Sequence, residues 1–247
     1  YPILGDKAWG WPGHLIDILA VLATLFGLAT SLGLGAQQAA AGINHVFGTD
    51  SGIGLQIGVI VGVTLLAVIS VVRGIDGGVK LLSNVNMLIA FVLLVFVALV
   101  GFSAAFGNLP NTVMGYVENI IPLSNPHGRE DETWMHGWTV FYWAWWVSWS
   151  PFVGMFIARV SRGRTIREFL IAVLLIPTLV TVLWMSIYGG IAIDQIINGV
   201  GALGLNGLPV VPLAMFHMLD ELPLSNILSF IAIVLVLVFF STSSDSG

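Results

Sequence analysis

Six apolar runs, each long enough to cross a membrane as a helix, alternate with charged gaps along this chain. The runs cover residues 15–46, 53–72, 81–106, 138–158, 169–193 and 224–240. A hydrocarbon core about 30 Å thick needs about 20 apolar residues in a helix. The runs are continuous, which excludes membrane-spanning β-strands, because the residues of such strands alternate in polarity. The sequence therefore predicts an all-α fold, a polytopic membrane helical bundle with six spans.

The charge content supports a lipid environment. Only 9% of the 247 residues are charged and 57% are hydrophobic, whereas a soluble domain carries about 25% charged residues. The net charge of −5 offers phosphate groups no attractive surface, so a nucleic-acid partner is excluded. The chain has no cysteine, which excludes disulfides and thiolate metal sites. We expect the lipid bilayer to be the solvent for most of the chain.

The basic residues predict the orientation of the spans. Seven of the eight basic residues lie in alternate gaps or before the first run: Lys7, Arg73, Lys80, Arg159, Arg162, Arg164 and Arg167. Short loops rich in Lys and Arg stay in the cytoplasm, so both ends of this chain are expected to be cytoplasmic in a multi-pass protein of the inner (plasma) membrane. The first residue is not Met and no signal-peptide pattern is present. We interpret residues 1–247 as a single transmembrane domain, incomplete at both ends.

The most unusual segment is 138–149, which holds five of the nine tryptophans in twelve residues. Residues three or four apart share a helix face, so Tyr142–Trp146, Trp145–Trp149 and Trp146–Trp149 are expected to pair along one side. Several aromatic faces together can hold a quaternary ammonium group, which cannot donate a hydrogen bond. The alternative is ordinary packing of large residues between helices, and the stripe by itself favours that alternative.

Two further residues of this segment bear on its chemistry. Trp149 lies about 16 Å along the helix from Trp138 at 1.5 Å per residue, near the middle of the membrane, where its indole N–H should need a partner inside the protein. Pro151 removes the amide that would bond to the carbonyl of Val147. Interrupted helices with exposed carbonyls form binding sites in secondary transporters. The alternative is an ordinary proline kink that a neighbouring helix satisfies.

These residues support a resemblance to a known family. The run 141–169, FYWAWWVSWSPFVGMFIARVSRGRTIREF, resembles the signature of the betaine/choline/carnitine transporter family. The resemblance continues through 23–35, 82–87 and 239–246, so it covers essentially the whole chain. It implies that the six helices are the fifth to tenth of twelve. It also implies part of an inverted-repeat fold like that of the neurotransmitter-sodium symporters, in which two five-helix repeats give alternating access to a central site.

The resemblance also implies the residues of the solute site. Trp146 matches the tryptophan that closes the central aromatic box of the family. Trp145 matches a position toward the outer path and Trp149 one toward the inner path, and Tyr142 and Phe141 complete the candidate set. The other walls of the box belong to the second helix of the family, which this sequence does not include.

Coupling-ion residues follow from the same resemblance. The main sodium site of the family uses a backbone carbonyl and two hydroxyls that match Phe239, Thr242 and Ser243. The alternative, which the residues alone favour, is that these hydroxyls bond back to carbonyls of their own helix. A second ion site would use Thr24 and Phe152. Its other threonine is replaced by Leu28 in this sequence, which argues against a second ion.

The resulting prediction is a secondary active transporter, not an enzyme, that takes up a quaternary ammonium solute such as glycine betaine or choline for osmoprotection. Na⁺ is the expected coupling ion, with no cofactor and no other metal, and a homotrimer is implied by resemblance. The alternatives are a proton-coupled choline importer and a carnitine/betaine exchanger of the same family. Exchangers carry an arginine where this sequence has Met87, which disfavours exchange. A channel would need rings of polar or carbonyl groups, and an enzyme would need more than the hydroxyls and indoles of the spans.

Overall fold

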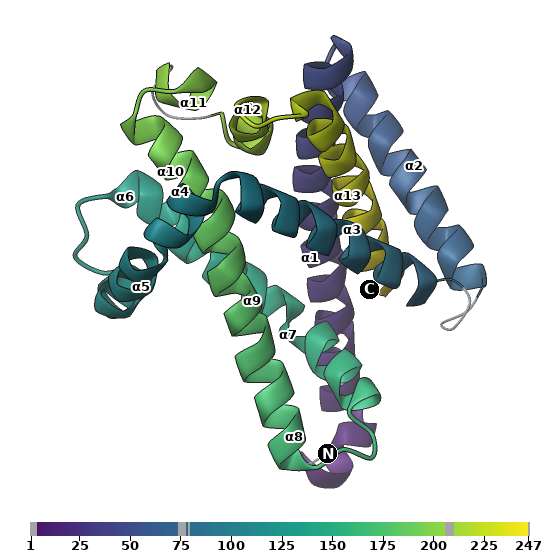
Figure 1. The fold of residues 1–247 in the computed structure, drawn as a ribbon. Helices are drawn as coiled ribbons and strands as arrows, with labels where there is room; N and C mark the ends of the chain where they lie inside the picture. Colours follow the sequence, from purple (N-terminus) through teal and green to yellow (C-terminus); the bar gives the residue numbers. More distant parts are fainter. Residues whose placement is uncertain (1–3, 74–77, 79, 206–209, 247) are drawn as a thin grey trace. The chain divides into compact units, whose positions relative to one another are not determined.

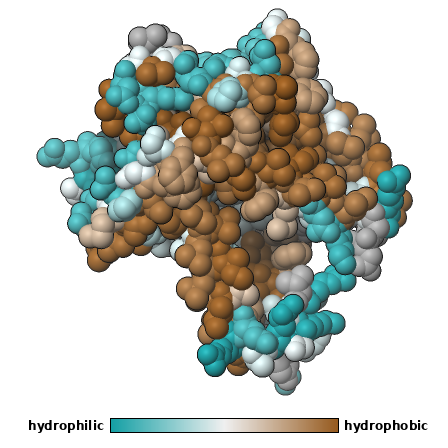
Figure 2. All heavy atoms as spheres, viewed as in Figure 1, coloured by the Kyte–Doolittle hydropathy of each residue, from teal (hydrophilic) through white to brown (hydrophobic). Residues whose placement is uncertain are grey.

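The structure, a computed structural model, describes residues 4–73, 78, 80–205 and 210–246, and every regular element in these ranges is a helix (Figure 1). Five helical segments within these ranges are long and apolar enough to cross a membrane: Trp11–Phe47, Ile53–Val72, Lys80–Val100, Ile166–Ile197 and Ser225–Ser244. The prediction of a helical membrane bundle is confirmed. Figure 2 shows hydrophobic residues over most of the visible face, with hydrophilic residues gathered at the loops.

The N-terminal part begins with a 3-10 turn, η1 (Gly5–Trp9), followed by α1 (Trp11–Phe47) and α2 (Ile53–Val72). With 37 residues, α1 is about 55 Å long at 1.5 Å per residue. This length exceeds the thickness of a hydrocarbon core, as the expected range 15–46 already required. The boundaries of α2 coincide with the expected range 53–72.

The third expected span, 81–106, consists of two helices, α3 (Lys80–Val100) and α4 (Phe102–Gly107), separated at Gly101. A Cβ atom built on Gly101 would lie 2.3 Å from the side chain of Ile191. The missing side chain therefore allows α10 to pack closely at this point, and the interruption falls where the two segments meet. Sequence periodicity could not show this, because the contact joins residues 90 positions apart.

The tryptophan-rich segment forms a continuous helical stretch made of α6 (Glu132–Trp134), the π-helix η3 (Met135–Val140) and α7 (Phe141–Val160). It is preceded by α5 (Leu109–Ser124). Among the six expected spans, this one is not in the set that is apolar enough to cross a membrane by composition. Its tryptophans, tyrosine, serines and proline lower its hydropathy, although 20 residues of α7 would extend about 30 Å.

The fifth expected span forms one rod, 166–197, in which α-helical and π-helical turns alternate. Its parts are α8 (Ile166–Leu170), η4 (Ile171–Leu175), α9 (Ile176–Trp184), η5 (Met185–Gly189) and α10 (Gly190–Ile197). The rod starts with a capping box: the backbone N–H of Thr165 donates to Glu168 Oε2 at 3.0 Å, and the N–H of Glu168 donates to Thr165 Oγ1 at 3.2 Å. This reciprocal pair satisfies amide groups that have no partner within the helix.

The C-terminal part contains α11 (Gly201–Leu205), η6 (Val211–Leu213), α12 (Ala214–Asp220) and α13 (Ser225–Ser246). The last helix begins at the expected place and continues beyond the expected range 224–240. At the end of α12, Asp220 Oδ1 lies 2.9 Å from His45 Nε2 at the end of α1.

The described chain divides into two compact units, each considered by itself. The first unit comprises residues 4–31 and 118–169, and the second comprises residues 32–117 and 170–246. The second unit holds the main apolar core, in which α13 packs against α2 and α3 (Figure 1). Phe216 is fully buried in this core, and a Cβ atom on Gly42 would lie 2.3 Å from its ring. Small residues of α1 thus bring the neighbouring helices close together.

Candidate functional site

The aromatic residues of 134–156 lie along one helical stretch of the first unit. The rings of Trp138 and Tyr142 are stacked with centroids 6.1 Å apart, and Tyr142 meets Trp146 edge to face at 6.5 Å. Phe141 and Trp145 also approach each other, with centroids 5.7 Å apart. The expected pairing of Tyr142 with Trp146 is therefore present. Trp149 instead makes its ring contact with Phe152, at 5.3 Å.

Trp146 presents its ring outward, with 62% of the residue exposed in this chain. Tyr142 is also exposed, whereas Phe141 and Trp145 are half-buried. Within the described residues Trp146 therefore borders no enclosed pocket, and the other walls of the box that the resemblance implies belong to a helix that this sequence does not include. The aromatic face of α7 is available to a ligand or to further protein, and its rings can supply cation–π contacts.

Phe141 and Trp145 line a cavity of about 250 Å³ in the first unit, together with Phe26, Gly27 and Thr30 of α1. These three residues of α1 stand in the first expected span, and none of them is among the residues that the sequence predicts for solute or ion binding. Small residues on α1 leave the space that the rings of α7 border. The sequence of the first span shows the small residues Gly27 and Thr30, but only the structure shows which helix they face.

Trp149 lies against Gly27, because a Cβ atom on this glycine would be 2.6 Å from Trp149 Nε1. The Nε1 atom is buried and has no hydrogen-bond partner among the described residues. The prediction that this indole N–H finds a partner inside the protein is therefore wrong for the described residues. A buried donor without a hydrogen-bond partner costs about 1–3 kcal/mol of stability. Gly27 does not offset this cost, because it gives the indole space but has no side chain that could accept a hydrogen bond.

The carbonyl of Val147, which Pro151 deprives of its amide partner, accepts a hydrogen bond from Ser150 Oγ at 2.8 Å. Ser148 Oγ bonds in the same way to the carbonyl of Trp145 at 2.8 Å. The helix continues through Pro151 to Val160. These local bonds agree with the alternative of an ordinary proline within a helix rather than with an unwound segment.

The candidate ion ligands lie in two separate places. In α13, Thr242 Oγ1 donates to the carbonyl of Phe239 at 2.8 Å, so two of the three expected oxygen ligands are neighbours. Ser243 is half-buried next to them. In the first unit, Thr24 Oγ1 bonds to the carbonyl of Ala20 at 2.9 Å, and Phe152 contacts the rings of Trp149 and Phe156. The hydroxyl of Thr242 thus makes the bond to its own helix that the alternative predicted, and the hydroxyl of Thr24 makes a bond of the same kind.

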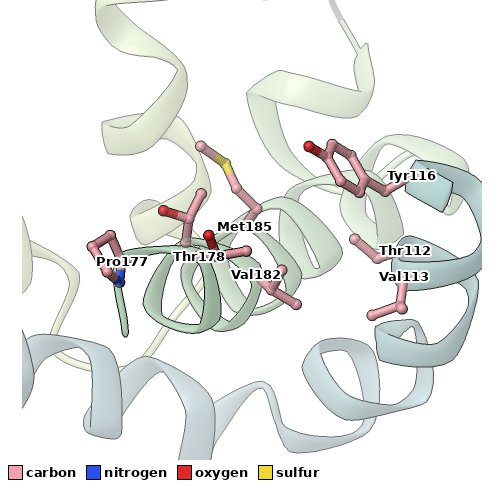
Figure 3. A pocket seen from close by; sticks show the side chains of 8 residues that line it. Thr112, Val113, Tyr116, Pro177, Thr178, Val182 and Met185 are labelled. Carbon is pink, nitrogen blue, oxygen red and sulfur yellow. The ribbon is translucent and has the colours of Figure 1, made fainter. Parts of the chain in front are cut away.

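A second cavity lies between α5 and the helical rod 176–185 in the second unit (Figure 3). Its volume is about 330 Å³, and it is lined by Thr112, Val113, Tyr116, Pro177, Thr178, Thr181, Val182 and Met185. The lining is mostly apolar, and the hydroxyl of Thr178 is already bonded to the carbonyl of Leu174 at 2.5 Å. It contains none of the residues expected to bind solute or ion.

The class of this protein follows from its fold, and its family follows from its sequence. The fold is that of a multi-pass membrane protein with an aromatic helix, and residues 1–247 match the sequence model of BCCT, the betaine/carnitine/choline family transporters. The chain therefore belongs to this family, as its resemblance to the signature implied.

Similar proteins cover the whole of this chain. It is 73% identical over 247 residues to glycine betaine transporter 1 of Vibrio parahaemolyticus and 72% identical to a glycine betaine/proline/choline/ectoine transporter of the same organism. It is 46% identical over 250 aligned residues to the glycine betaine transporter OpuD of Bacillus subtilis. The chain spans 47%, 44% and 48% of the lengths of these relatives. Their names describe transporters rather than enzymes, in agreement with the expectation from the sequence.

Proposed function

We propose that this chain forms part of a secondary active transporter that takes up a quaternary ammonium solute, such as glycine betaine or choline, in symport with Na⁺. The observation that carries the proposal is the exposed ring face of Trp146, which continues a row of aromatic contacts along α7. A methylated ammonium group has no N–H to donate and binds best to such faces. The names of the relatives support a betaine-type solute.

In this proposal the solute lies against Trp146, and the remaining walls of its site come from sequence outside residues 1–247. That would convert the exposed face of Trp146 into an enclosed one, with Tyr142, Trp145 and Phe141 on its outer side and Trp149 on its inner side. Desolvation strengthens a cation–π contact from about 0.5–1 to about 2 kcal/mol or more. No acidic side chain occurs in α7, so the rings would provide the attraction.

The proposed coupling site consists of the Phe239 carbonyl and the hydroxyls of Thr242 and Ser243. Hydroxyl and carbonyl oxygens can surround a hard monovalent cation without a buried carboxylate. The hydrogen bond from Thr242 Oγ1 to the Phe239 carbonyl, 2.8 Å long, supports the proposal because the two oxygens are neighbours; a bound cation would replace the hydroxyl proton between them. The proposal includes no second ion at Thr24 and Phe152, since Leu28 stands where the second threonine would be and supplies no oxygen.

Two alternatives within the family remain testable. An exchanger would place a positive charge at Met87, which is an exposed, uncharged residue of α3. A proton-coupled choline importer would need a titratable group in its spans, and the candidates in this sequence, Asp17 and Asp245, lie near span ends. The proposal further places the protein in the inner (plasma) membrane as a homotrimer, with both ends of this chain in the cytoplasm.

The solute site is tested by Trp146→Ala in full-length transporter reconstituted in liposomes. Loss of about 2 kcal/mol of cation–π energy corresponds to an approximately 30-fold weaker apparent affinity for glycine betaine. Trp9→Ala is the control, because Trp9 is similarly exposed but lies in η1, and it should leave uptake unchanged. Radiolabelled uptake that is equal in the Trp146→Ala variant and the wild type would refute the site.

The ion site is tested by Thr242→Ala, for which we expect an approximately tenfold rise in the sodium concentration that gives half-maximal uptake, equivalent to one charge-assisted contact. Thr178→Ala is a matched control, because Thr178 makes the same kind of bond to a carbonyl of its own helix. If both variants respond alike, or if potassium supports uptake as well as sodium, sodium coupling through α13 is wrong.

A further inference from the structure

A network of polar contacts around Arg129 joins three segments of the first unit. Arg129 Nη1 donates to the carbonyl of Leu123, at the end of α5, at 2.9 Å. It also lies 3.4 Å from Thr139 Oγ1 in η3. Thr139 Oγ1 in turn donates to the Leu123 carbonyl at 3.0 Å. One guanidinium group therefore ties the end of α5 to the start of the tryptophan-rich helix.

Asp131 neutralises this guanidinium. Arg129 Nε donates to Asp131 Oδ1 at 2.7 Å, and Nη2 pairs with Oδ2 in the same carboxylate. Such a bidentate pair has a fixed geometry that a lysine cannot reproduce. The hydrogen bonds from Arg129 hold the pKa of Asp131 below its ordinary value. The carboxylate therefore stays ionised, and the pair intact, across the neutral and mildly acidic range.

The loop between α5 and α6 reverses the chain direction and so brings Arg129 close to both Leu123 and Thr139. Gly128 has a φ angle of +70°, a left-handed conformation that glycine adopts without steric cost. The backbone N–H of His127 donates to Asn125 Oδ1 at 3.1 Å, which stabilises the turn just before it. The chain therefore doubles back, and the side chain of Arg129 is only 12% exposed although it belongs to a loop.

Arg129 also contacts Trp134, the first ring in a series of aromatic contacts along the helical stretch. Its Cζ atom lies 5.1 Å from the centroid of the Trp134 ring, within the range of a cation–π contact. Trp134 approaches Trp138 at 6.5 Å, Trp138 stacks on Tyr142 at 6.1 Å, and Tyr142 meets Trp146 at 6.5 Å. We call these four residues, Trp134, Trp138, Tyr142 and Trp146, the aromatic row.

The π-helix η3 explains why residues four apart stay in one row. In an α-helix with 3.6 residues per turn, each step of four residues rotates by about 40° beyond a full turn. The i→i+5 bonds of a π-helix put more residues into each turn, which rotates the following side chains back. Because η3 covers Met135–Val140, it lies within the row and keeps its first members aligned with Tyr142.

We propose that Arg129 is a positioning residue for solute recognition: it fixes the loop end of the aromatic row, while Asp131 cancels its charge so that the row stays attractive to a quaternary ammonium group. The proposal rests on the proposed function for its choice of solutes. Arg129 acts through the rings and through Thr139, and it does not contact the solute. Without Asp131, an uncompensated cation would stand at one end of a cation-binding row.

The test compares Arg129→Lys, Arg129→Ala, Asp131→Asn and Glu130→Gln in the full-length transporter reconstituted in liposomes. Glu130→Gln is the matched control, since Glu130 is exposed, neighbours Asp131 and carries the same charge. Both arginine variants should raise KM for glycine betaine about tenfold, equivalent to one or two charge-assisted hydrogen bonds, with the maximal rate within about twofold. Asp131→Asn should raise KM more for choline, a cation, than for zwitterionic glycine betaine, and added salt should reduce this difference.

A second measurement does not depend on transport. A spin label on His127→Cys, in full-length protein that carries no other cysteine, should become more mobile in both arginine variants and in Asp131→Asn but not in Glu130→Gln. Unchanged mobility in Arg129→Ala would overturn the proposal, as would wild-type KM in Arg129→Lys or equal effects of Asp131→Asn and Glu130→Gln. If the wild-type protein takes up no quaternary ammonium solute, the proposed function fails. The claim about solute recognition then fails with it, while the label still decides whether Arg129 fixes the loop.

Discussion

The helices α13 and α7 are of similar length but differ in what they bury. Among the side chains of α13 that the structure describes, seven are buried, and Ala232, Ser229 and Ser241 have at most 1% exposure. Among the side chains of α7 that the structure describes, none is buried, and Trp146 is largely exposed. The second unit therefore completes much of its packing within this chain, whereas the aromatic face of α7 is left open. A helix with an open aromatic face is suited to recognition, and one with a filled interface to support.

The largest expected effect tests this difference directly. Phe216→Ala should destabilise the protein by about 3–5 kcal/mol, because it removes a fully buried ring from the core of the second unit. Trp146→Ala should leave the free energy of unfolding nearly unchanged while it weakens uptake. Thermal unfolding in detergent measures both variants. An equally large loss of stability in Trp146→Ala would mean that α7 is a packing helix, and the contrast with α13 would disappear.

An intermediate effect is expected where α13 meets α1. A Cβ atom on Gly35 would lie 2.3 Å from the ring of Phe240, whereas one on Gly33 would meet nothing within 4 Å. Gly35→Ala should therefore cost about 1–3 kcal/mol through overpacking. Gly33→Ala, in the same helix, should be neutral or stabilise it by up to about 1 kcal/mol. Equal unfolding temperatures for the two variants would show that α13 does not pack as closely as described.

The smallest effect concerns a local feature that needs neither unit to be packed. Thr165→Ala removes the hydroxyl of the capping box at the start of the 166–197 rod and should cost about 1 kcal/mol. Faster amide hydrogen exchange at residues 166–169 would report the frayed end. Thr30→Ala is the control, because its hydroxyl bonds to the carbonyl of Phe26 within a helix. Equal exchange at residues 166–169 in wild type and Thr165→Ala would remove the assigned role of this cap.

Local chemistry was predictable wherever the partners are close in sequence. The apolar runs identified helices because hydrophobic length decides membrane crossing, and Thr165 with Glu168 forms the cap that their spacing allows. Tyr142 and Trp146 pair as their four-residue separation requires. By contrast, the prediction of an interrupted helix with a free carbonyl at Val147 is not met. The hydroxyl of Ser150 donates to the carbonyl that Pro151 leaves without an amide partner, and the helix continues.

Contacts between distant residues were not predictable in the same way. The indole of Trp149 was expected to find a polar partner, but it packs on Gly27 with its Nε1 unpaired among the described residues. Arg129 is the basic residue that stands outside the alternate gaps, and nothing in the pattern along the sequence indicates that it joins Leu123, Asp131, Trp134 and Thr139. A loop in which Gly128 has a left-handed conformation brings these groups together. Hydrophobic periodicity does not indicate where a loop reverses the chain direction.

The sequence by itself determined that the chain is helical and membrane-spanning, which family it belongs to, and which rings occur at helical spacing. These properties depend on local composition and on residues within one or two turns of each other. Only the tertiary structure decided that Phe26 and Gly27 share a cavity with Trp145, that α13 is packed while α7 is open, and that Arg129 supports the aromatic row. These arrangements depend on excluded volume and hydrogen-bond geometry between segments far apart in the chain. The local pattern of residue types along the sequence does not specify such contacts.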